Sequence, residues 1–246
     1  MNLLQSDNQW SQSIDPKRTM TKAEFFSSYA SHYAVLIYVA IVLATGALSL
    51  YLMQSWWQLL GSFALVALVY PAVEFVLHRF VLHSRTLYRM PWTAGLWRRI
   101  HYDHHMNPND LSVLFGAPYT TIPAVLAPTL PLGYLAFGWP GAAATVCGGF
   151  IALLIYEFFH CAAHLPVKFE SRIMQHMRRH HALHHFHSEN GNYGIVTDVL
   201  DRVLGTEYEV GTGMGPSPTV RNLGYTSEEA KKYPWVAQLD QAQPRN

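Results

Sequence analysis

Four long apolar stretches constrain this chain more than any other feature of its sequence. They span residues 33–53, 56–77, 114–137 and 141–165, and none contains a lysine or an arginine. A helix of about 20 apolar residues is long enough to cross the hydrocarbon core of a bilayer. Only Gln54 and Ser55 separate the first two stretches, which have no polar face and therefore do not resemble helices of a soluble protein. The sequence predicts an all-α integral membrane protein with four transmembrane helices, arranged as two hairpins.

The basic residues indicate how these helices are oriented. All 17 lysines and arginines lie before the first stretch, within 78–113, or after residue 165. Because lysine and arginine are enriched in cytoplasmic segments next to transmembrane helices, both termini and both histidine-rich segments are expected in the cytoplasm. A cleaved signal peptide is not expected, since about 30 mainly polar residues precede the first stretch. We expect a bacterial inner membrane rather than the endoplasmic reticulum, because no retrieval signal or donor domain is recognised.

The chain divides into three segments. Residues 1–30 form a cytoplasmic arm, in which "TKAE" at 21–24 has the pattern of a capping box and predicts a short interfacial helix; a disordered arm is the alternative. Residues 31–207 form the membrane domain. Residues 208–246 form a cytoplasmic tail that is first rich in glycine and proline and then contains one helix-like stretch, "TSEEAKKY".

Composition excludes two classes of function. The net charge is +1, so nothing indicates a nucleic-acid partner. Cys147 and Cys161 are the only cysteines, and both stand in apolar surroundings, so neither a disulfide framework nor a zinc finger is expected.

Histidine is the unusual residue, because 13 of the 14 histidines lie between residues 78 and 187. Ten of them form four clusters: His78 and His83 in "HRFVLH", His101, His104 and His105 in "HYDHH", His160 and His164 in "HCAAH", and His181, His184 and His185 in "HALHH". Spacings of three and four place side chains on one face of a helix. His78 and His83 are five residues apart, so they can share a site only if the helix ends or kinks between them.

These ten histidines are predicted to bind metal. Neutral imidazole is a ligand for iron, copper and zinc, and burying so many imidazoles without a metal would carry an uncompensated desolvation cost. Ten ligands exceed the needs of one ion and suit two. One ambiguity stays open: His176, His180, His184 and His187 form a second helical stripe, so His180 or His187 could replace a chosen ligand.

Three acidic residues accompany the clusters. Glu74 and Glu157 each share a helix face with a clustered histidine, and we expect them to orient its imidazole; a carboxylate reaching out to water is the alternative. Pro108 must end the histidine helix, and Asp110 beyond it could either cap the next element or bind back to a ligand.

The order of these clusters resembles that of the fatty acid hydroxylase and sterol desaturase superfamily of membrane oxygenases. "HHMNPND" resembles that family's H-H-x-x-P-x-D motif, and "GIVTDVLDRVLGT" resembles its closing motif, with Asp201, Arg202, Gly205 and Thr206 in place. Leu200 stands where the family usually has tryptophan. The resemblance covers roughly residues 60–207.

The resemblance implies two iron ions held by the ten histidines, at a site that zinc would also occupy readily. It implies hydroxylation of a lipid C–H bond, on a fatty acyl chain, with dioxygen and electrons from a separate carrier of the cytochrome b5 or ferredoxin type. The arginines that flank the clusters could dock that carrier or could simply follow the positive-inside rule: Arg98, Arg99, Arg178 and Arg179.

Other functions remain as alternatives at this stage. A sterol, hopanoid or carotenoid hydroxylase or desaturase would belong to the same superfamily. A non-enzymatic membrane metal-binding or transport protein is the alternative from another class, although transport sites usually lie near the bilayer midplane and these clusters lie at or just beyond the ends of the apolar stretches. A ferritin-like bundle needs two Glu-x-x-His motifs, and the sequence has one, at Glu157–His160.

Overall fold

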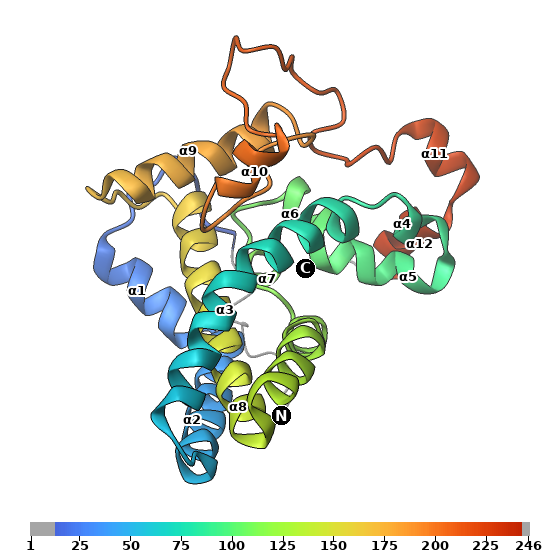
Figure 1. Ribbon diagram of the computed structural model, residues 1–246. Coiled ribbons are helices and arrows are strands. Elements are labelled where there is room, and N and C mark those ends of the chain that lie inside the picture. Colours follow the sequence, from blue (N-terminus) through green and yellow to red (C-terminus); the bar gives the residue numbers. More distant parts are fainter. Residues whose placement is uncertain (1–12, 243–246) are drawn as a thin grey trace, which may run out of the picture.

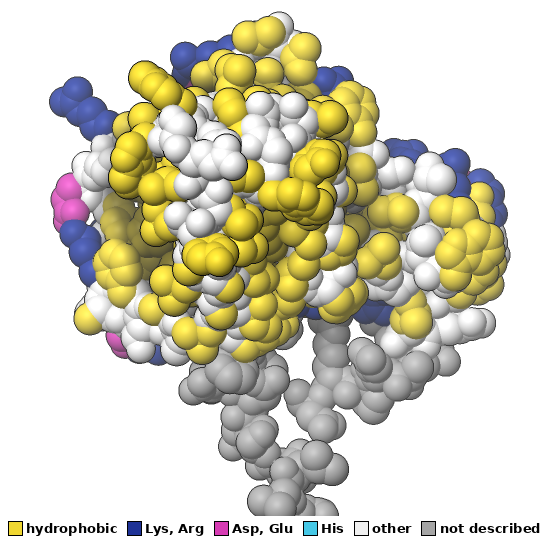
Figure 2. All heavy atoms as spheres, turned by 60° about the horizontal axis from the view of Figure 1, so that its bottom comes forward, with side chains coloured by type: hydrophobic (Ala, Val, Ile, Leu, Met, Phe, Trp, Pro, Cys, Tyr) yellow, Lys and Arg dark blue, Asp and Glu magenta, His cyan; other side chains and the backbone are white. Residues whose placement is uncertain are grey.

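The computed structural model describes residues 13–242, which form helices and loops and, apart from two isolated bridges, no β-structure. Three helices are long: α2 (Tyr33–Leu52), α3 (Trp56–Val76) and α8 (Pro118–His164). With their continuations, the stretches Tyr33–Leu52, Trp56–Arg89 and Leu111–His164 are long and apolar enough to cross a membrane. In Figure 1 these helices form the lower part of the molecule. Figure 2 shows that this end is covered by hydrophobic side chains, with lysines and arginines at its margins.

The turn between α2 and α3 forms where the sequence predicts it. The hydroxyl of Ser55 accepts a hydrogen bond from the amide of Trp57, and the side chain of Gln58 reaches back in a capping box. Such a cap satisfies amides at the start of a helix that have no partner within it. Two apolar helices can therefore follow each other with almost no loop.

Helix α8 is broken at Phe137 and Gly138, where Gly138 has φ +67°. Beyond the break the chain returns alongside itself: the Thr145 hydroxyl donates to the Thr129 carbonyl at 2.8 Å. Gly133 and Gly141 permit the close approach, because a Cβ on Gly133 would lie 2.4 Å from the Gly141 carbonyl oxygen. The two parts of α8, 118–137 and 139–164, are hereafter called its first and second halves; Figure 1 shows them in green and yellow.

The N-terminal arm contains the predicted capped helix, α1 (Lys22–Ser31), which begins at a capping box between Thr21 and Glu24. It is anchored by Phe25, which is fully buried and packs edge-to-face against Phe158 and Phe169. The aromatic side chain of Phe158 therefore belongs to the core between α1 and the second half of α8.

Shorter elements cover the upper end of the long helices. In chain order they are the π-helix η1 (Leu77–Leu82), α4 (Thr86–Arg89), α5 (Pro91–Trp97), the π-helix η2 (Arg98–Tyr102), α6 (Asp103–Met106), α7 (Leu111–Leu114), α9 (Arg172–Phe186), α10 (Val199–Leu204), α11 (Ser227–Lys232) and α12 (Trp235–Ala242). Met106 ends α6 just before Pro108, as predicted. The helix predicted in "TSEEAKKY" is α11. Together with α12, it brings Leu223 and Val236 into a second core around Tyr88 and Trp97.

Candidate metal centre

The ten clustered histidines come together at the upper ends of α3 and α8. They form two groups whose candidate ligand atoms lie within 4.8 Å of one another in each group. The first group is His104, His160, His164, His181 and His185, and the second group is His78, His83, His101 and His184. His105 lies between the groups, with a ligand atom near those of His184 and His185.

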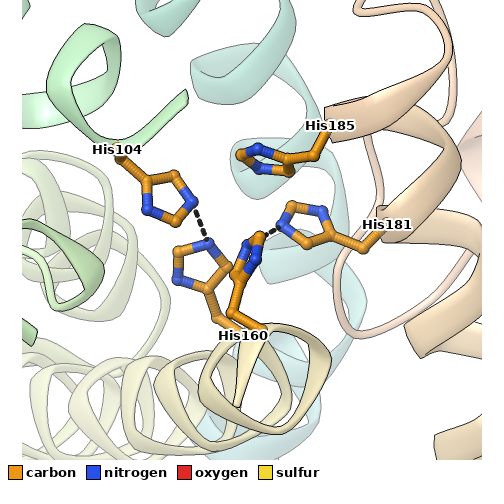
Figure 3. Close-up of side chains that lie close together, drawn as sticks. His104, His160, His181 and His185 are labelled. Atoms are coloured by element: carbon orange, nitrogen blue, oxygen red, sulfur yellow. Dashed lines mark hydrogen bonds between the residues drawn. The ribbon is translucent and has the colours of Figure 1, made fainter. Parts of the chain in front are cut away.

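The first group joins α6, the end of α8 and α9. The Nε2 atoms of His104 and His160 lie 2.9 Å apart, and those of His164 and His181 are separated by the same distance. Figure 3 shows His104 and His160 pointing at each other, with His181 and His185 approaching from α9. Nitrogens this close can bind one ion, since metal–imidazole bonds are about 2.0–2.1 Å long.

The second group depends on a π-helix. In η1 the amide of His83 donates to the carbonyl of His78 at 3.2 Å, which is the i to i+5 pattern of a π-turn. This wider turn brings side chains five residues apart to the same side, as the predicted kink required. The Nε2 atom of His83 lies 2.8 Å from that of His101, which itself belongs to the π-helix η2.

Each H-x-x-H-H cluster contributes to both groups. His101 belongs to the second group and His104 to the first, whereas in α9 His181 belongs to the first and His184 to the second. His105 bridges them, with its ring stacked on His185 at 4.0 Å between centroids. Its Nε2 atom lies 3.1 Å from that of His101. The sequence pattern alone did not reveal this division.

Backbone carbonyls orient three of these imidazoles. The Nδ1 atoms of His78, His105 and His184 lie 2.5, 2.9 and 2.8 Å from carbonyl oxygens of Tyr193, Val220 and Gly191, respectively. A carbonyl only accepts, so each Nδ1 carries the proton and each Nε2 keeps a lone pair for a metal. The Nε2 atoms of His78 and His184 are buried and have no hydrogen-bond partner among residues 13–242.

The carbonyls of Gly191 and Tyr193 belong to a loop, residues 189–196, that buried acids hold in place. Asp201 accepts from the amides of Tyr193 and Gly194 at 3.0 and 2.7 Å and from the hydroxyl of Thr206 at 2.6 Å. Burial alone would raise the pKa of Asp201, but hydrogen bonds from His180, Thr206 and the two amides outweigh it and lower the pKa. The aspartate of the closing motif therefore supports two histidines through the loop.

Glu74 and Glu157 do not orient imidazoles directly, and that expectation was wrong. Glu74 Oε1 accepts from the amides of Ile195 and Val196 at 2.7 and 3.2 Å, so it acts on the same loop. Glu157 Oε1 accepts from the amide of Gly116 at 2.9 Å. Both acids bind backbone because segments distant in the sequence are brought against them.

Of the two roles predicted for Asp110, the structure shows helix capping. Its carboxylate accepts a hydrogen bond from the amide of Ser112 at 2.9 Å, at the start of α7. His180 donates to Asp201 at 3.1 Å, and His187 donates to the carbonyl of Met214 at 3.0 Å. Neither lies in the two groups.

The flanking arginines are engaged within the protein. Arg98 pairs with Asp103 at 3.0 Å, and Arg99 donates to the carbonyl of Phe115 at 3.3 Å. Arg178 donates to the carbonyls of Leu165 and Val167, and Arg179 pairs with Glu209 at 3.2 Å. These contacts favour a structural role over carrier docking for Arg98, Arg99 and Arg178.

The electrostatic setting favours the neutral form that binds metal. Burial, followed by the neighbouring imidazoles, lowers the pKa of five histidines from the two H-x-x-H-H clusters well below 6.5: His101, His104, His181, His184 and His185. Burial lowers the pKa of His105 to about 3. Nine buried imidazoles and the half-buried imidazole of His83 have converging nitrogens and no thiolate among them, which fits a centre for iron or zinc.

An apolar cavity of about 590 Å³ leads to this centre. It is lined by α3, α7 and both halves of α8, and it reaches His78, His101, His104 and His160. Its size is in the range of small-molecule sites. Helices suited to a membrane, a buried histidine centre and an apolar cavity that ends at it define a helical membrane protein with a candidate metal site for an apolar ligand.

Comparison with known proteins agrees with this class. The family described as "Fatty acid hydroxylase" matches residues 63–206, so the chain belongs to the fatty acid hydroxylase family. It is 28% identical over 144 residues to the fatty acid 2-hydroxylase of Rattus norvegicus, covering 58% of this chain and 38% of the rat protein. It is 30% identical over 141 residues to the dihydroceramide fatty acyl 2-hydroxylase FAH2 of Arabidopsis thaliana, covering 56% and 57%.

A solved structure shares the fold. It is full-length Scs7p, of which only the hydroxylase domain is visible, and the TM-score is 0.64 at 22% identity. The similarity covers 74% of this chain and 68% of that one.

Proposed function

We propose that this protein hydroxylates a C–H bond of a fatty acyl chain in a membrane. The observation that carries the proposal is the apolar cavity that runs between α3 and α8 and ends at four of the ten histidines. A chain lying in it would have one carbon at the histidine centre and the rest in apolar surroundings. The rat and Arabidopsis relatives are named as 2-hydroxylases of fatty acids and fatty acyl groups, which favours an acyl chain over a sterol and favours attack at carbon 2.

The ten histidines are the proposed ligands of two iron ions, one for each group, with His105 between them. Bound iron would supply the activation of dioxygen, which amino-acid side chains cannot provide. The carbonyls of Gly191, Tyr193 and Val220 would keep three Nε2 lone pairs directed at the metals. The apolar lining would keep bulk water away from the reacting carbon and hold it in one orientation.

The proposed topology has four membrane crossings in two hairpins, with the histidine centre in the cytoplasm. It is supported by the break at Phe137–Gly138, which splits α8 into two halves, and by the absence of lysine and arginine from both tight turns. Electrons would come from a separate carrier.

Lipid mass analysis tests the function. Cells expressing the wild type are compared with cells expressing a His104→Ala, His184→Ala double variant, which removes one ligand from each group. His187→Ala is the control, because His187 lies in no candidate metal group and donates to the carbonyl of Met214 instead. We expect acyl chains with one added oxygen in the wild type and the control only, and about two metal ions per chain in both. A loss of two hydrogens would indicate a desaturase instead. Bound metal with unchanged lipids would contradict the proposed reaction.

A further inference from the structure

The cavity has a measurable depth along two separate helices. On α3 and the start of η1, lining residues recur at each turn from Leu65 to His78. On the first half of α8 they recur from Tyr119 to Leu132. Each interval corresponds to a rise of about 20 Å along an α-helix. Because both walls run the same distance away from the histidines, the cavity is a long slot.

At the end far from the histidines, the slot is bounded by a contact between α3 and α8. Beyond Leu65 the two walls meet, because the ring of Phe137 packs so tightly on Gly61 that a Cβ there would lie 2.5 Å from it. The lining at this end includes Thr129 and Thr145, which are both buried, and the Thr145 hydroxyl donates a hydrogen bond to the Thr129 carbonyl. A chain that enters from the histidine end therefore meets a floor formed by packed side chains and backbone.

We infer that this floor selects substrates by chain length and admits about 16 carbons between the reacting carbon and the terminal methyl. In an extended chain each C–C bond of about 1.5 Å advances the chain by about 1.25 Å, so about 16 carbons fill about 20 Å. The inference rests on the proposed function and adds its substrate class: acyl chains of about 16 to 18 carbons, oxidised near the carboxyl end.

Both directions of mismatch are disfavoured. A shorter chain leaves the floor uncovered and loses about fourfold in binding for each methylene that stays unburied. A longer chain must displace the contact between Phe137 and Gly61, which close packing resists. Selection should therefore have a sharp upper limit and a graded lower one.

A series of tryptophan substitutions on α3 tests whether the depth of the slot limits the length of the substrate chain. Leu65 and Val69 both line the slot and lie one turn apart, which is about 6 Å or about five carbons. Cells are supplied with saturated fatty acids of 10 to about 20 carbons, and hydroxylated products are sorted by length. We expect Leu65→Trp to shorten the longest product slightly and Val69→Trp to shorten it by about five carbons more. Leu68→Trp is the matched control, because Leu68 is 78% exposed on the same helix, and it should leave the distribution unchanged.

A binding measurement separates this inference from the proposed reaction. Purified full-length protein is photolysed with a 16-carbon fatty acid carrying a diazirine at its methyl end, and the labelled residues are identified by mass spectrometry. Labels around Leu65, Thr129 and Leu132 are expected, and their loss in Val69→Trp but not in Leu68→Trp supports selection by chain length. If the wild-type protein is labelled at these residues yet hydroxylates no chain, the inference on chain length holds and the proposed reaction is wrong. If product lengths are the same in all variants, or if the labels lie elsewhere, the inference that the slot selects by chain length is wrong.

Discussion

His78 and His83 are joined by one π-turn, in which the amide of His83 donates to the carbonyl of His78 at 3.2 Å and both imidazoles reach the second group. Single π-turns occur often at functional sites. Here the turn allows H-x4-H, a spacing unsuited to an α-helix, to supply two ligands to one group. The same group receives His101 from a second π-helix, so altered helical geometry is built into the centre twice.

The division of the histidines predicts separable metal losses. His83→Ala removes a ligand from the second group only, and His160→Ala removes one from the first only. We expect each variant to retain about one ion per chain where the wild type retains about two. Each removed histidine would be a ligand of one ion only, so the ion in the other group keeps all its ligands. Metal content of the purified proteins checks this, with His187→Ala as a control that should retain both ions. Loss of both ions from His83→Ala would show that the groups do not bind independently.

Asp201 is expected to be important for stability although it touches no group member. Asp201→Asn replaces a buried acceptor by an amide whose NH₂ would face donors, because Asp201 receives hydrogen bonds from two amides, Thr206 and His180. Leaving such donors unsatisfied costs about 3 kcal/mol. Thermal unfolding in detergent should show a lower midpoint. The metal content should also fall, because the loop would no longer hold the Gly191 and Tyr193 carbonyls in place to orient His184 and His78.

The control for Asp201 is Glu209→Gln. Glu209 forms an exposed ion pair with Arg179, and such pairs contribute under about 1 kcal/mol. An equal loss of stability in both variants would contradict the special role of Asp201.

The close approach inside α8 gives a third prediction. Gly133→Ala would place a Cβ 2.0 Å from the Thr145 hydroxyl and 2.4 Å from the Gly141 carbonyl oxygen, so the two halves must move apart. Overpacking of this kind costs about 1–3 kcal/mol. The unfolding midpoint in detergent should fall, whereas Gly215→Ala should leave it unchanged, because beyond its chain neighbours the added Cβ would meet no described atom within 4 Å. A normal midpoint for Gly133→Ala would mean that the halves are not packed as described.

Much of the centre could be predicted from the sequence, because helical spacing fixes which histidines share a face. The ends of the apolar stretches likewise predicted a turn at Gln54–Ser55 and a break between residues 137 and 141, and the structure has both. The partition of each H-x-x-H-H cluster could not be predicted, since it depends on how α6 and α9 lie relative to each other. The partners of Glu74 and Glu157 were missed for a related reason: both acids bind amides of loops that only the folded chain brings close.

The last prediction concerns metal removal. Buried nitrogens such as His78 Nε2, His184 Nε2 and both ring nitrogens of His185 have no hydrogen-bond partner in the described residues. A metal that satisfies them binds the folded state and not the unfolded one, so it stabilises the fold by about 4 kcal/mol at 1,000 times its Kd. A chelator should therefore lower the unfolding midpoint of the wild type, and added iron or zinc should restore it. The His104→Ala, His184→Ala double variant should start low and respond to neither, because each group has lost a ligand. If neither treatment changes the unfolding midpoint of the wild type, the fold around these histidines does not depend on metal.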